Sequence, residues 1–325
     1  MWVPNIPVVI VSTVAATAGG LCLFNLIVTL QYDSRDFYGG PPYDKNVKAE
    51  GKVVIVTGAT SGIGREAAWD FARRGAKVFM ACRNMETCEE VRRDIVLESN
   101  NKFVYCRPCD LASTDSIRKF VQRFKSEEPQ LHVLVNNAGV MEPPASVTRD
   151  GFETQLGESA PSRVITVSGS VHHRGQINKD DLNFTHKYDA PAAYAQSKLA
   201  NLLFVRELGR RMLGTGVSVV AVDPSLTDTN ITRHMSMMKS VSRYVVYPIF
   251  WPFMKSAKIG SQAIVHAALD PALSDCSGDY YVDMKKKEPS KLAQDYELAS
   301  WLWKVSEKWT KLDQHKAALA QAKAA

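Results

Sequence analysis

The sequence predicts an α/β fold in which one doubly wound parallel sheet forms a single domain behind an N-terminal transmembrane helix. Two patterns support this prediction: wholly apolar runs of strand length alternate with helical stretches, and Pro7–Leu30 contains no charged residue. Apolar strands that alternate with helices are typical of a parallel sheet covered on both faces. The 325 residues, 45% hydrophobic and 23% charged, fit one large domain with appendages better than two domains.

The segment Pro7–Leu30 is long enough to cross a hydrocarbon layer about 30 Å thick as a helix. No Lys or Arg precedes it and its apolar run is longer than that of a signal peptide, although a buried core helix remains an alternative. We therefore expect a membrane anchor over residues 1–30 and a polar linker over 31–50. Basic residues follow the segment, so the positive-inside rule predicts a single-pass protein with a cytosolic domain. We expect the membrane to be that of the endoplasmic reticulum or the mitochondrion, and the segment does not distinguish the two.

Charge and cysteine usage exclude several classes of function. The formal net charge of +6 is spread over the chain without a nucleic-acid-binding motif, and Arg73-Arg74 and Lys285–Lys287 are expected on solvated faces. The six cysteines show no metal-binding spacing, and Cys106 and Cys109 end a predicted strand, so we expect reduced thiols and no metal.

Strands and helices are expected to alternate over residues 51–312, followed by an alanine-rich tail over 313–325. Period and composition predict strands over 53–57, 77–82, 103–109, 133–136, 164–167, 217–222 and 279–282, and helices over 65–75, 85–98, 113–126 and 194–213.

A glycine-rich turn follows the first of these strands and indicates a Rossmann-type nucleotide site. Its candidate cofactor-binding residues are Gly58, Ser61, Gly62, Ile63 and Gly64. Glycines in such a turn allow backbone N–H groups and a helix N-terminus to approach a pyrophosphate. This position between a strand and a helix is the context that confirms the spacing.

The end of the second strand indicates which dinucleotide would bind. An acidic residue there would bind the ribose 2′-hydroxyl of NAD, but this chain has Arg83. A guanidinium suits a 2′-phosphate in charge and geometry, which predicts NADP(H). The alternative is that Arg83 is merely an exposed side chain.

Four motifs in this order resemble the short-chain dehydrogenase/reductase family: Gly58–Gly64, Asp110-Leu111, Asn136–Gly139 and Tyr194 with Lys198. The likeness covers roughly residues 51–312. It narrows, through residues 81–84, 148–153, 181–183 and 194–201, to the membrane-anchored retinol dehydrogenase group (retinol dehydrogenase 13-like).

The resemblance implies a role for each matching residue. Tyr194 would be the catalytic acid/base, and Lys198 would hold the nicotinamide ribose and lower the pKa of Tyr194. Residues four apart share a helix face, and a nearby cation favours a phenolate. The remaining residues implied to bind or support the cofactor are Asp110, Leu111, Asn137, Ala138, Gly139 and Pro224.

The sequence departs from the family pattern in three places. Gly169 stands where the family has a catalytic serine, with Ser168 and Ser170 beside it; Ser170 is the candidate replacement. Pro224-Ser225 replaces the family's Pro-Gly. The helix of roughly twenty residues that carries the family's catalytic asparagine is missing near 157–160. A splice variant or gene-assembly error explains this gap better than an adapted fold.

Two functions from different classes follow. The first is an NADP-dependent oxidoreductase that interconverts retinol and retinal, or a similar lipophilic alcohol and aldehyde, by hydride transfer. The uncharged aromatic run 244–254 suits an apolar pocket or a membrane-facing entry as well as it suits core packing. The second is a catalytically impaired, membrane-tethered NADP-binding protein. Without the missing helix, which commonly forms part of the family's dimer interface, we do not expect a stable homodimer.

Overall fold

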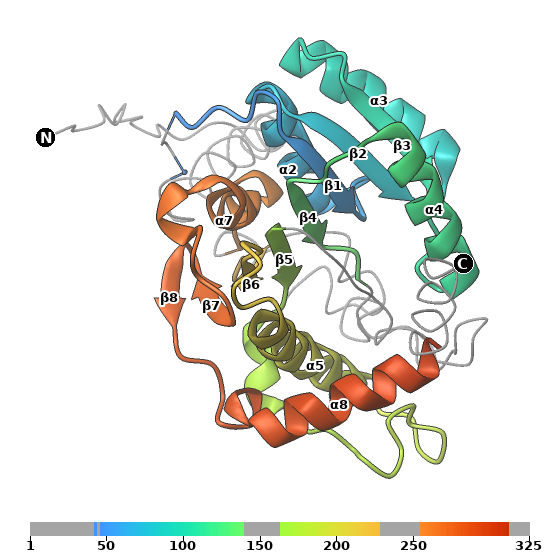
Figure 1. Cartoon of the computed structure of the whole chain (residues 1–325), viewed down its shortest axis with the longest axis vertical. Coiled ribbons are helices and arrows are strands. Elements are labelled where there is room, and N and C mark those ends of the chain that lie inside the picture. Colours follow the sequence, from blue (N-terminus) through green and yellow to red (C-terminus); the bar gives the residue numbers. More distant parts are fainter. Residues whose placement is uncertain (1–41, 44–45, 140–162, 228–253, 312–325) are drawn as a thin grey trace, which may run out of the picture.

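The computed structural model describes residues 42–43, 46–139, 163–227 and 254–311. Its strands form one sheet in the order β3-β2-β1-β4-β5-β6-β7-β8 (Figure 1). The strands are β1 (Val53–Thr57), β2 (Lys77–Cys82), β3 (Val104–Pro108), β4 (Val133–Asn136), β5 (Arg163–Val167), β6 (Val219–Asp223), β7 (Asp279–Val282) and β8 (Lys285–Lys287). The helices are α2 (Gly62–Arg73), α3 (Met85–Ser99), α4 (Thr114–Glu127), α5 (Ala190–Arg211), α7 (Ala257–Leu269) and α8 (Tyr296–Trp309), with short 3₁₀ turns η1 (Ser170–Arg174), η5 (Pro271–Leu273) and η6 (Leu292–Gln294).

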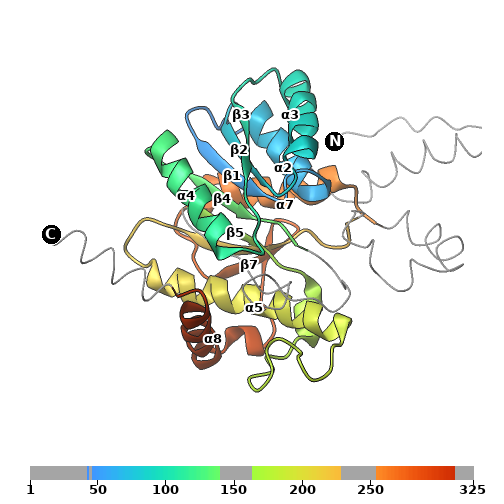
Figure 2. The same cartoon turned by 90° about the vertical axis from the view of Figure 1, so that its right-hand side faces the viewer.

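The strands β1 to β7 are parallel, and only β8 pairs antiparallel to its neighbour. Every residue of β1 and β6 is buried, because helices cover both faces of the sheet (Figure 2). On one face α2, α3 and α7 pack against a continuous cluster that includes Val54 and Val56. The predicted doubly wound sheet in a single domain is confirmed.

The opposite face carries two separate apolar clusters. One lies under α4 and includes Val53, Ile55 and Leu134, and the other lies under α5 and α8 and includes Val164 and Ala221. The boundary between the two clusters lies between β4 and β5, the strands whose connection holds the predicted truncation. Residues 140–162, with that junction, lie outside the described residues.

All seven predicted strands and four predicted helices are present, with ends shifted by a few residues. The structure adds α7, α8 and β8, which local patterns did not indicate. Helix α7 is almost wholly buried and therefore shows no polar face. Strand β8 consists of three exposed lysines paired with β7. The expectation of a solvated face is thus confirmed for Lys285–Lys287.

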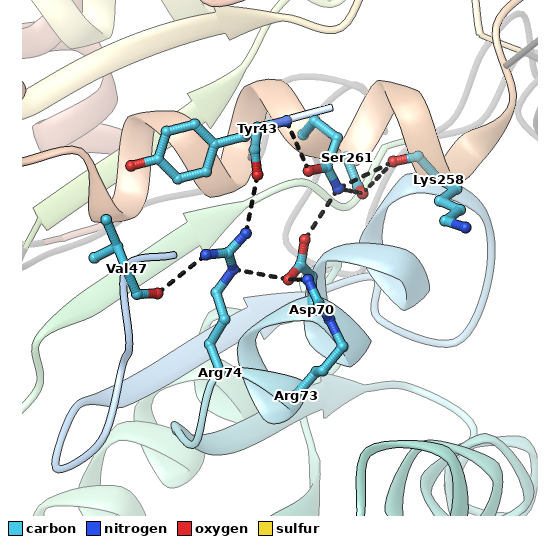
Figure 3. Close-up of polar contacts among 8 residues, drawn as sticks. Tyr43, Val47, Asp70, Arg73, Arg74, Lys258 and Ser261 are labelled. Carbon is cyan, nitrogen blue, oxygen red and sulfur yellow. Dashed lines mark hydrogen bonds and ion pairs between the residues drawn. The ribbon is translucent and has the colours of Figure 1, made fainter. Parts of the chain in front are cut away.

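The expectation of a solvated side chain is wrong for Arg74, the residue that follows the last residue of α2. Its side chain is only 7% exposed, and its Nε donates to Asp70 Oδ1 at 2.8 Å (Figure 3). Its other nitrogens donate to the carbonyl oxygens of Tyr43 and Val47. Asp70 accepts a further hydrogen bond from Gln262 Nε2 of α7 at 3.0 Å. Neighbouring Arg73, by contrast, is half exposed.

This network fastens the end of the predicted linker to the domain. Tyr43 is 6% exposed and Ala49 is fully buried, both in the core cluster under α2 and α7. The backbone N–H of Tyr43 also donates to Gln262. Part of the segment 31–50 therefore packs as a strap across α2 and α7.

Two of the cysteines form a disulfide, so the expectation of reduced thiols is wrong for them. Cys88 in the first turn of α3 and Cys106 in β3 are bonded, with their Cα atoms 6.0 Å apart. Among the described residues, Cys82, Cys109 and Cys276 form no disulfide. The two cysteines are 18 residues apart in the sequence. They come together because β3 returns to pair with β2, which places Cys106 of β3 beside Cys88 of α3.

The predicted anchor and the aromatic run lie almost entirely outside the described residues. Among the residues that are described, no helix has the length and apolarity needed to cross a membrane. Met254, the last residue of the aromatic run, is buried.

We expect Arg74→Ala to lower the free energy of unfolding by about 2–3 kcal/mol, because the buried Asp70 carboxylate loses a charged hydrogen bond while it keeps the half-exposed Arg73 guanidinium and the Gln262 amide as partners. The control is Arg92→Ala, which removes an exposed ion pair with Glu89 and should cost less than about 1 kcal/mol. Urea denaturation measures both. Equal effects would contradict the role given to the strap network.

Candidate active site

The turn after β1 is shaped to receive a ligand close to its backbone. Gly58 and Gly62 have φ of +62° and +55°, a left-handed conformation that favours glycine. A Cβ on Gly58 would lie 2.8 Å from the Cα of Ala138, and one on Gly64 would collide with the Asn137 amide. Ser61 is exposed and makes no side-chain cap on α2, which leaves the first N–H groups of that helix available to an anion. Ile63 packs partly against the core.

Hydrogen bonds join this turn to the end of β4. Thr57 Oγ1 accepts from the N–H groups of Asn137 and Ala138, both at 3.0 Å, and donates to the Val135 carbonyl. The Asn137 amide donates back to the carbonyl of Thr57 at 3.0 Å and to that of Gly58 at 3.4 Å. The predicted supporting role of Asn137 and Ala138 thus has a physical basis in these bonds.

The ends of β2 and β3 lie beside this turn. Arg83 is exposed directly after β2, and Asn84 then caps α3 by accepting from Thr87 N–H. Burial raises the pKa of the Cys82 thiol to about 11, so this thiol is neutral beneath the loop.

After β3, the Asp110 N–H donates to Ser116 Oγ and the Asp110 carboxylate accepts from Ala112 N–H. Leu111 packs against the cluster under α4. Asp110 and Leu111 are therefore fixed at the same edge of the sheet as Gly58.

The predicted Tyr/Lys pair lies on α5 at the end of β5. Lys198 Nζ is 5.5 Å from the centre of the Tyr194 ring and donates to the carbonyl of Val167 at 3.3 Å. Lys198 is 7% exposed, and a Cβ on Gly139 would lie 3.9 Å from its Nζ. The ammonium group is therefore held between the ends of β4 and β5, beside the glycine-rich turn.

The position of the family's serine has no hydroxyl. Gly169 has extended backbone with φ of −174°, and no atom lies within 4 Å of where its Cβ would be. Ser168 is buried and donates to the Lys198 carbonyl at 2.9 Å, so it supports α5. Ser170, the predicted replacement, is exposed at the start of η1.

The loop after β6 completes the edge. Pro224 is buried, and Ser225 has φ of +61°, a conformation in which the family's glycine carries no strain. The Ser225 N–H donates to Asp223 Oδ1 at 2.7 Å, and its hydroxyl donates to Asp283 at 2.8 Å.

Sequence reasoning missed the residues that act through these contacts. Thr57 and Asn201, whose amide also donates to the Val167 carbonyl at 3.1 Å, were given no role. Thr57 directly precedes the glycine motif Gly58–Gly64 and Asn201 ends the motif 194–201, and this position beside or within a motif was the available signal. Over the described ranges, no group of acidic, His or Cys side chains could hold a metal ion.

The glycine-rich turn after β1, the N-terminus of α2 and the Tyr/Lys pair of α5 all lie at the carboxyl ends of the parallel strands. Ligands bind at this edge in open α/β sheets. These features define a Rossmann-type α/β protein with a glycine-rich turn at the carboxyl edge of its sheet. Residues 52–169 match the short chain dehydrogenase family.

Human retinol dehydrogenase 12 is 40% identical over 301 residues, 87% of this chain and 94% of that protein. Human retinol dehydrogenase 13 is 41% identical over 292 residues, 84% and 88% of the two chains. The crystal structure of an uncharacterised protein from Mycobacterium paratuberculosis superposes with a TM-score of 0.67, at 30% identity, over 84% of this chain and 98% of that one. The chain belongs to the short-chain dehydrogenase/reductase family of oxidoreductases, and its relatives include the retinol dehydrogenases.

We expect Gly58→Ala to destabilise the fold more than Gly214→Ala does. Both glycines have positive φ, +62° and +77°, but only Gly58 has a neighbouring backbone atom where the Cβ would go. The difference in the free energy of unfolding should be about 1–3 kcal/mol, the usual cost of overpacking. Urea denaturation of the two variants measures it, and equal stabilities would contradict the close contact with Ala138.

Proposed function

We propose that this protein is an NADP-dependent oxidoreductase that acts on retinol/retinal or a similar lipophilic alcohol and aldehyde. The observation that carries the proposal is the Lys198 ammonium, buried against the Val167 carbonyl and one helical turn from Tyr194. The retinol dehydrogenases among its relatives support the lipophilic substrate.

The residues present fit a dinucleotide. The backbone around Gly58–Gly64 and the N-terminus of α2 would hold the pyrophosphate, and Arg83 would pair with the 2′-phosphate. A nicotinamide bound there would supply or accept the hydride. Tyr194 would donate or accept the proton at the substrate oxygen, and Lys198 would favour the phenolate form of Tyr194.

The catalytically impaired alternative rests on Gly169, because no side chain there can orient a substrate oxygen. A second observation concerns length. The alignment with mouse retinol dehydrogenase 13 has 316 positions, but it contains only 91% of the 325 residues of this chain. The mouse protein therefore has residues within the aligned region that this chain lacks. This supports our inference that a segment of the domain is missing.

We further propose that residues 1–30 anchor the protein in a membrane, with the domain on the cytosolic side. Full-length protein expressed in cells should remain with membranes through an alkaline carbonate wash, and a chain that starts at Pro42 should be released. Soluble full-length protein would refute the anchor.

For the cofactor, we expect NADPH to bind at least about tenfold more tightly than NADH, which is roughly 1.4 kcal/mol. The preference should disappear in Arg83→Asp, because a carboxylate repels a 2′-phosphate. It should persist in the control Arg93→Asp, which makes the same change of charge within α3. Calorimetric titration gives both affinities. An unchanged preference in Arg83→Asp would overturn the assignment.

For activity, we expect retinal reduction at least about 100-fold slower than that of a full-length relative, because small errors in alignment cost about 10²-fold. Gly169→Ser, together with the family's missing helix, should restore the rate, since the serine has open space. Tyr194→Phe in that restored chain should abolish it. NADPH-dependent retinal reduction by the unaltered chain at the relative's rate would refute this expectation.

A further inference from the structure

A buried carboxylate lies at the end of β6, close to the Tyr/Lys pair. Val222 pairs with Val167, the residue whose carbonyl receives Lys198 Nζ, so Asp223 lies one position beyond that pair. Asp223 is 3% exposed. The recognised motifs give it no function.

Both oxygens of this carboxylate are used. Oδ1 accepts from the N–H of Ser225 at 2.7 Å, and Oδ2 accepts from the hydroxyl of Tyr280 at 3.0 Å. Burial and the adjacent Asp223 carboxylate raise the pKa of Tyr280, so its hydroxyl remains a donor. A charged acceptor makes each of these bonds stronger than a neutral one.

The first bond holds Ser225 in its left-handed conformation, which a residue with a Cβ rarely adopts. The turn is fastened further along as well. Thr227 Oγ1 donates to the Pro224 carbonyl, Lys255 N–H donates to the Leu226 carbonyl, and the ammonium of Lys255 pairs with Asp283 at 2.6 Å. Residues 223–227 therefore form a rigid turn organised around one carboxylate.

The same group reaches the end of β5. The ring of Tyr280 contacts His172 edge-on, with centroids 5.2 Å apart. His172 is fully buried; its Nδ1 bonds the Gly169 carbonyl at 2.8 Å, and its Nε2 accepts from Ser290 N–H. Two hydrogen bonds and one ring contact therefore connect Asp223, through Tyr280 and His172, to Gly169.

In a doubly wound sheet each half binds one half of a dinucleotide, and the ligand crosses where the strand order reverses. That reversal lies between β1 and β4. Arg83 marks the adenine half beside β2, so the ends of β4, β5 and β6, with Lys198 between them, border the nicotinamide half.

We propose that Asp223 is a positioning residue that acts through Ser225 to hold the turn 223–227 against the nicotinamide half of the dinucleotide site. This inference rests on the proposed function. It predicts that loss of the carboxylate weakens contacts to the nicotinamide half alone.

Two probes separate the halves of the ligand: NADPH, and 2′-phospho-ADP-ribose, which lacks the nicotinamide. In calorimetric titrations of the full-length protein, Asp223→Ala should weaken NADPH by at least about tenfold, the scale of a lost charged hydrogen bond, and change 2′-phospho-ADP-ribose by less than about twofold. Asp223→Asn keeps one acceptor oxygen and should give an intermediate, equally selective loss, which also carries the test if the alanine variant does not fold.

Adding Ser225→Gly to Asp223→Ala should recover much of the NADPH affinity, because glycine adopts this φ without strain. Asp70→Ala, a control with an equally buried carboxylate under the strap, should not separate the two probes. Equal weakening of both probes by Asp223→Ala, or no weakening, would overturn the proposal. If the unaltered protein bound neither probe, the proposed function itself would fall, and this inference with it.

Discussion

The link between the ends of β1 and β4 is the constraint on which the rest of the site depends. These strands are neighbours in the sheet although β2 and β3 lie between them in the sequence, and the Thr57 hydroxyl oxygen accepts hydrogen bonds from the N–H groups of both Asn137 and Ala138. These two hydrogen bonds hold Ala138 so close to Gly58 that a Cβ atom on Gly58 would lie 2.8 Å from the Cα of Ala138. The glycine-rich turn is therefore a consequence of strand register as much as of local sequence.

The binding half and the catalytic half of the site are built in different ways. Backbone N–H groups, a helix N-terminus and glycines make up the first, and these need only the sheet and α2 to be in place. The second needs side chains from several elements at once: Lys198 from α5, a carbonyl from β5, and the turn after β6. Gly169, which carries no side chain, lies in this second group at the end of β5.

Two apolar clusters of described residues, one under α4 and one under α5 and α8, cover the second face of the sheet. The opposite face has one continuous cluster under three helices, whereas the two clusters described on this face lie on either side of the boundary between β4 and β5. Burial of apolar surface is the main source of stability, and α8 contributes Leu298 and Leu302 to the cluster on the α5 side. The Tyr/Lys pair lies on that side.

Local sequence patterns were enough to predict the fold class, the seven parallel strands, the glycine-rich turn and the pairing of Tyr194 with Lys198, because apolar runs, glycine spacing and helical periodicity are local properties. Contacts between separate elements are seen only in the folded chain: Arg74 is buried against Asp70, Cys88 is bonded to Cys106, and Asp223 organises a turn. The folded chain also shows helix α7, whose buried surface has no amphipathic pattern. Each of these depends on side chains that approach one another from separate elements, and the free energy of such contacts comes from exclusion of water and pairing of charges at distances that local sequence does not encode.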